Sequence, residues 1–153
     1  MDIDKDLEQV IRDTLFAFVS NNAKTAPTAV KALSKYPNPT VMPLMQMIFT
    51  GAVHFASDCE RPSLDELHEL AANIKEYYDE VSIVKMPLSP IRLLLGAVWG
   101  YPQTEKVPQG EALVWMVMIA AYVLQLGDGT WSEQLDRVVW EIDPHFGMTG
   151  TPL

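Results

Sequence analysis

Apolar side chains in this chain recur at spacings of three and four residues, the period of an amphipathic helix. The clearest example is residues 64–81, where six apolar side chains fall within about 100° of helical arc. They are Leu64, Leu67, Ala71, Ile74, Tyr78 and Val81. Similar spacing or apolar runs predict further helices at residues 3–20, 26–36, 40–59, 91–99 and 131–143. No stretch alternates apolar and polar residues as a half-buried strand would.

Residues 111–126 differ, because from Ala112 to Leu124 no side chain is charged or carries an amide. A helix without a polar face must be buried on every side. The run is shorter than the roughly 20 apolar residues that a membrane span needs. We therefore predict an all-α fold, a compact single-domain bundle of about seven helices around a buried central helix at residues 111–126.

Polar and proline positions predict where the helices begin and end. Ser63 with Glu66, and Thr130 with Glu133, have the spacing of capping boxes. Pro43 is expected in the first turn of the third helix, and Pro144 is expected to end the last one. We assign residues 1–146 to one all-helical domain and expect a flexible C-terminal tail at residues 147–153.

The formal net charge of −9 argues against a nucleic-acid partner, whose phosphates require clustered lysine and arginine. A single cysteine rules out an intramolecular disulfide. The chain begins with acidic residues rather than a basic and apolar leader, so we expect a cytoplasmic protein, and we expect no membrane partner. Charge is unevenly distributed, because no acidic residue occurs between Thr14 and Ser57, whereas residues 58–80 are strongly acidic.

The acidic residues of the fourth predicted helix carry the main functional hypothesis. Asp65, Glu69, Glu76 and Glu80 share one narrow arc, away from the apolar stripe. We expect a non-enzymatic protein–protein interaction module that binds a basic protein partner through these four residues. Immunity proteins against toxins, inhibitor proteins and assembly chaperones are of this type. The alternative interpretation is a solvated surface, and a homo-oligomer that buries exposed residues such as Tyr77 is a further hypothesis.

A second hypothesis places chemistry between the third and fourth helices. His54 and Asp58 lie four residues apart, and His68 with Glu69 could approach them if the two helices pair. Imidazoles and carboxylates can hold a divalent metal, so these are weak metal-ligand candidates for a metal-dependent hydrolase or a small-ligand-binding helical protein. A local hydrogen-bonded pair would explain His54 and Asp58 equally. We assign no catalytic residue and expect no cofactor, because the common phosphate-loop, nucleophile and metal motifs are absent from the sequence.

Overall fold

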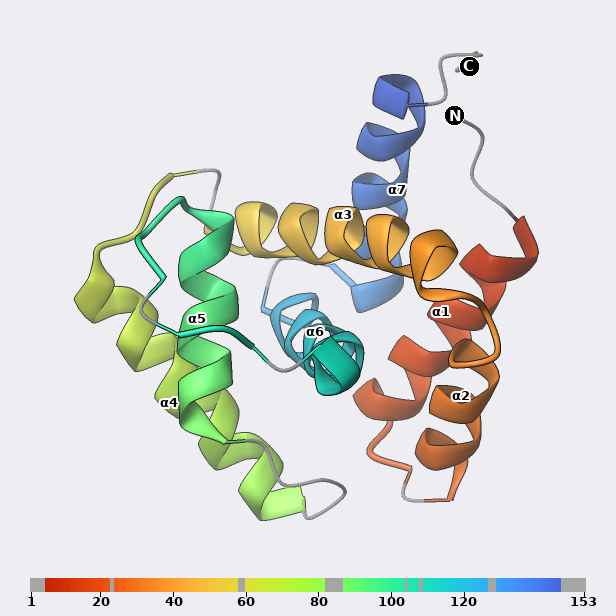
Figure 1. Ribbon diagram of the computed structural model, residues 1–153, viewed down its shortest axis with the longest axis horizontal. Coiled ribbons are helices and arrows are strands. Elements are labelled where there is room, and N and C mark those ends of the chain that lie inside the picture. Colours follow the sequence, from red (N-terminus) through yellow and green to blue (C-terminus); the bar gives the residue numbers. More distant parts are fainter. Residues whose placement is uncertain are drawn as a thin grey trace.

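The computed structural model describes residues 5–22, 24–57, 60–81, 87–103, 105–107, 109–126 and 129–146. Within those ranges the chain forms seven helices and no strand, which confirms the predicted all-α fold (Figure 1). The helices are α1 (Lys5–Val19), α2 (Thr25–Leu33), α3 (Asn38–Ala56), α4 (Leu64–Val81), α5 (Leu88–Val98), α6 (Gln109–Val123) and α7 (Trp131–Phe146). The tail expected at residues 147–153 lies outside the described ranges.

Two prolines lie deeper within helices than the sequence analysis expected. Helix α3 begins at Asn38, so Pro43 lies in its second turn rather than in its first. Helix α7 continues past Pro144 to Phe146, so the prediction that Pro144 ends it was wrong. A proline removes only its own N–H donor and crowds the carbonyl four residues earlier. Near a helix end this disturbs few hydrogen bonds, and the helix can continue for part of a turn.

Both predicted capping boxes are confirmed. The N–H of Ser63 donates to the carboxylate of Glu66 at 2.9 Å, and the N–H of Glu66 donates to Ser63 Oγ at 3.1 Å. Thr130 and Glu133 make the same exchange before α7, with both backbone bonds at 3.2 Å. These bonds hold the pKa of each glutamate below its ordinary value. Each box satisfies N–H groups that the first turn of a helix leaves without a partner.

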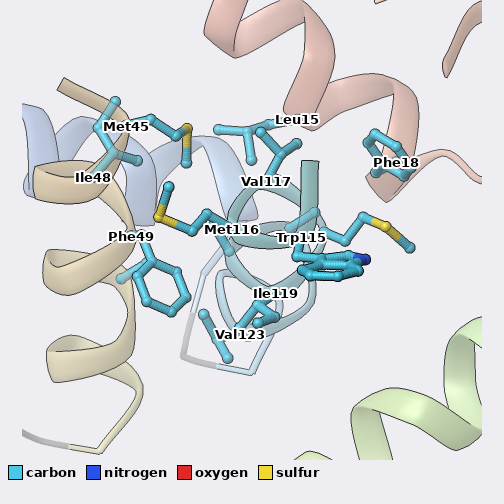
Figure 2. Packing of buried hydrophobic residues seen from close by; sticks show 14 of the residues in the cluster. Leu15, Phe18, Met45, Ile48, Phe49, Trp115, Met116, Val117, Ile119 and Val123 are labelled. Atoms are coloured by element: carbon cyan, nitrogen blue, oxygen red, sulfur yellow. The ribbon is translucent and has the colours of Figure 1, made fainter. Parts of the chain in front are cut away.

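Helix α6 is covered on several sides by other helices. From Ala112 to Leu124 every residue is buried except Val114 and Tyr122, which are partly buried. Figure 1 shows α6 nearly end-on, below α3 and between the α4–α5 pair and the α1–α2 pair. In Figure 2, Met116 is directed toward α3 and Val117 toward Leu15 of α1. Different faces of α6 therefore pack against different helices, which is why the sequence shows no polar face there.

Helix α4 is fixed at one edge of the molecule by its apolar stripe and by one buried polar side chain. It packs chiefly against α5. The buried Tyr78 hydroxyl donates a hydrogen bond to the backbone carbonyl of Met118 in α6. Burial, followed by the neighbouring Tyr77 and Tyr122, raises the pKa of Tyr78 above its ordinary range. This hydrogen bond satisfies the phenol inside the core and fixes the rotation of α4, so that its acidic side is turned outward.

Candidate functional site

Four exposed acidic residues lie along one side of α4, in two pairs that are two helical turns apart. Asp65, Glu69, Glu76 and Glu80 are all exposed, and we call this set the acidic ridge. At 100° and 1.5 Å per residue, the ridge occupies about 60° of arc and runs for about 22 Å along the helix. The opposite side of α4 carries buried apolar residues. The amphipathic pattern therefore positions the ridge by burying the other face of the same helix.

The acidic ridge lacks ion pairs in the part of the chain that the structure describes. None of its four carboxylates forms an ion pair with a residue in the described part of the chain. The nearest lysine in sequence, Lys75, instead pairs with Asp79 at 2.7 Å, off the ridge. Asp65–Glu69 and Glu76–Glu80 are like-charge pairs four residues apart, an arrangement that destabilises a helix by a few tenths of a kcal/mol per pair. The ridge is thus an exposed negative surface whose carboxylates have no ion-pair partner among the described residues, although Lys75 lies beside Glu76 and Glu80.

One half of the ridge borders a hollow. Glu76 and Glu80, together with the ion-paired Lys75 and Asp79, line a hollow of about 340 Å³ between α4 and the start of α5. Its floor includes the apolar side chains of Ala72 and Leu88. A long basic side chain could place its methylene groups on this floor and its charge between the carboxylates. Asp65 and Glu69 do not line this hollow.

His54, the first of the metal-ligand candidates, is engaged with an aromatic side chain. Its ring stacks on Trp99 at the end of α5, with ring centroids 4.2 Å apart and planes 11° from parallel. Both His54 Nε2 and Trp99 Nε1 are buried without a hydrogen-bond partner in the described structure. His54 therefore fills the junction between α3 and α5, where stacking rather than hydrogen bonding holds the ring.

The other metal-ligand candidates lie elsewhere. His68 and Glu69 are exposed on α4, and α4 packs mainly against α5 rather than against α3. Asp58 lies outside the described residues. Among the described residues, no group of three or more histidine, cysteine and acidic side chains is arranged to hold a metal ion. The hypothesis was conditional on the third and fourth helices pairing, and α4 instead packs chiefly against α5.

Sequence reasoning missed a second cleft, of about 520 Å³, between α4, α5 and the segment that follows α5. Its walls carry Arg92, Glu105 and His68 above an apolar floor that includes Leu64 and Leu93. These residues are spread over some 40 positions of the chain, from 64 to 105. Leu64 was predicted to belong to the apolar stripe of α4, yet it is exposed. No other feature of the sequence indicates the cleft.

Tyr77, named as an exposed residue in the oligomer hypothesis, is partly buried by contacts within the chain. Its hydroxyl donates to Asn21 Oδ1 at 3.0 Å, and its ring meets Tyr78 and Tyr122 edge-on. Tyr77 therefore joins α4 to α6 and to the end of α1. These contacts within the chain explain the partial burial of Tyr77 without contact with a second protein molecule.

Comparison with known proteins assigns no function to these surfaces. No family model, curated protein or solved structure matches the chain. Within the described ranges, no helix combines the length and the apolar character that crossing a membrane requires. Function is therefore inferred from the chemistry of the surface.

Proposed function

We propose that this protein is a non-enzymatic interaction module whose acidic ridge binds a basic protein partner. An immunity protein, an inhibitor or an assembly chaperone would have this kind of surface. The observation that carries the proposal is the stripe of four exposed carboxylates on α4, none of which is paired with a described cation. A surface of one sign steers an oppositely charged partner and selects against others. We also propose a cytoplasmic location, consistent with the single cysteine.

Helix energetics support this proposal. Both like-charge pairs of the ridge lower the stability of α4 when the protein is alone. A partner that places arginine or lysine between these carboxylates would remove the repulsion and form charge-assisted hydrogen bonds. The hollow beside Glu76 and Glu80 offers such a partner an apolar contact as well as a charged one. Binding would then depend strongly on salt, because the interacting charges are exposed.

The test is the double charge reversal Glu69→Lys with Glu76→Lys. Affinity purification from the native host at low salt should recover a basic protein with the unaltered chain and lose it with this variant. The same complex should dissociate as the salt concentration rises from about 0.05 to 0.5 M, over which the Debye length falls severalfold. Recovery of the same partners at the same salt resistance by the ridge variant would refute the proposal.

A matched control separates the ridge from net charge. The double variant Asp13→Lys with Glu111→Lys reverses two exposed carboxylates on α1 and α6. Both double variants change the net charge from −9 to −5, because each replacement adds two positive units. Only the ridge variant should lose the partner. Equal loss in both would show that the association depends on overall charge and not on α4.

A further inference from the structure

The cleft between α4 and α5 is separate from the acidic ridge. It has a volume of about 520 Å³, and none of the four ridge residues lines it. Pockets that bind small molecules have volumes of roughly 300–1,000 Å³. Such pockets usually combine an apolar lining with a few polar groups that fix the orientation of the ligand. This cleft meets both conditions.

Its apolar surface comes from both helices. Leu64 on α4 and Leu88 and Leu93 on α5 line the cleft, together with the buried Gly96. Leu64, in the first turn of α4, is 48% exposed. An apolar group seated in the cleft would cover this leucine. The gain would be about 25 cal/mol for each Å² of apolar surface removed from water.

Charged groups of opposite sign face the same cleft without pairing. Arg92 and Glu105 both line it, yet no ion pair joins them, and Arg92 has no hydrogen-bond partner in the described structure. Among the described residues, Glu105 accepts one long hydrogen bond, from Ser89 Oγ at 3.4 Å. His68 adds a further hydrogen-bonding group that is likewise without a described partner. The cleft therefore offers one unused cation and one nearly unused anion.

One wall of the cleft is held in place before any ligand binds. The Tyr101 hydroxyl donates to the carbonyl of Pro62 at 2.6 Å, and the Arg61 guanidinium lies 4.0 Å from the centre of the Tyr101 ring. The N–H of Tyr101 also donates to the carbonyl of Gly96 at 3.0 Å. These contacts tie the segment after α5 to the start of α4 and to α5 itself. A preformed wall lowers the entropy that a ligand must lose on binding.

We infer that the α4–α5 cleft binds a small zwitterion with an apolar side chain, such as a free apolar amino acid. The ligand carboxylate pairs with the Arg92 guanidinium, whose planar fork suits bidentate contact. The ligand ammonium group pairs with the Glu105 carboxylate, and the apolar side chain lies against Leu64 and Leu93. This small-molecule site is additional to the proposed binding of a basic protein and does not depend on it.

A zwitterion fits these charges better than a ligand with one charge. A simple anion would meet the Glu105 carboxylate inside the cleft and a chain of net charge −9 outside it. A simple cation would leave Arg92 unpaired and would itself be opposed by that guanidinium. A zwitterion satisfies both groups and adds no net charge. The two charged contacts also fix its orientation over the apolar floor.

The test measures binding of L-leucine and L-phenylalanine to the full chain by isothermal titration calorimetry. We expect saturable binding of at least one of them at a single site, with a dissociation constant below about 10 mM. N-acetyl-phenylalanine lacks the ammonium group, and phenylalanine amide lacks the carboxylate. Each should bind at least about tenfold more weakly than phenylalanine, because each leaves one cleft charge unpaired. Absence of saturable binding by both amino acids would overturn the inference.

Two variants assign the charges. Arg92→Gln and Glu105→Gln should each weaken binding at least about tenfold, and both should keep the fold because both side chains are exposed. The matched controls are Lys31→Gln on α2 and Glu111→Gln on α6, which are exposed and lie outside the cleft, and which should bind as the unaltered chain does. Circular dichroism confirms that each variant is folded. Undiminished binding by Arg92→Gln or Glu105→Gln, or equal binding of the acetylated compound, would contradict the assignment.

Discussion

At the scale of single residues, Gly51 is a position where the absence of a side chain lets two helices approach closely. A Cβ atom placed on Gly51 would lie 2.7 Å from Val138 Cγ1, where α3 packs against α7. Val138 is 1% exposed, and a β-branched side chain in a helix has one strongly preferred rotamer. The sequence gives no hint of this contact, because a glycine within an apolar helix looks the same whether or not another helix lies against it.

Overpacking usually costs about 1–3 kcal/mol, and alanine gains about 1 kcal/mol over glycine in helix propensity, so Gly51→Ala should destabilise the fold by up to about 2 kcal/mol. Gly96→Ala is the matched control, because its Cβ would meet other atoms only at 3.6 Å and beyond. The control should be neutral or stabilising by up to about 1 kcal/mol. Urea unfolding followed by circular dichroism measures both. Equal stability of the two variants would show that Val138 yields without cost.

At the scale of helices, the sequence predicts best where the polar side chains are periodic. Helix α4 was located closely because its stripe and its capping box both mark it. Helices α3 and α6 have no clear polar face, so only prolines and composition suggested their ends. Helix α6 spans Gln109–Val123 rather than 111–126, and α3 begins at Asn38 rather than at residue 40. The ends of a fully apolar helix depend on which other helices pack against it, and a single sequence does not show that packing.

The capping box of α4 makes a prediction at this scale. Ser63→Ala removes the hydroxyl that accepts a hydrogen bond from the N–H of Glu66, and should lower the free energy of unfolding by about 1 kcal/mol. Ser34→Ala, which removes only an exposed hydrogen bond to the carbonyl of Val30, is the control and should change stability little. Thermal unfolding of both variants measures the difference. An unchanged midpoint for Ser63→Ala would mean that water replaces the cap without loss.

At the scale of the whole molecule, the exposure of the ridge followed from periodicity, but the cleft did not. The ridge lies on one helix, so the 3.6-residue period alone places its carboxylates side by side. The cleft combines residues of α4, α5 and the segment after α5, and it exists because α4 pairs with α5. The sequence left open which helix packs against α4, and a site near His54 required α3 to do so, whereas the cleft near Arg92 requires α5. Helix pairing depends on the fit of side chains across the core, and the amphipathic pattern of one helix does not specify its partner.

Acidification should produce two separate events, because net charge and helix caps respond to different carboxylates. The isoelectric point expected from the sequence is about 4.6, so the self-repulsion that keeps molecules apart disappears near that pH. Hydrogen bonds from Ser63 and Thr130 lower the pKa of Glu66 and of Glu133, so more than half of each carboxyl is still ionised there. A group with a lowered folded pKa contributes stability above its unfolded pKa and loses it as the pH falls through the folded value.

Light scattering should therefore rise near pH 4.6 while the helical circular dichroism persists, and helix should be lost only at lower pH. In the double variant Glu66→Gln with Glu133→Gln, light scattering should still rise as the net charge falls to zero. The helical circular dichroism of this variant should depend less steeply on pH in the acid range. Loss of helix before the rise in scattering would show that other buried or paired carboxylates, and not the caps, control acid stability.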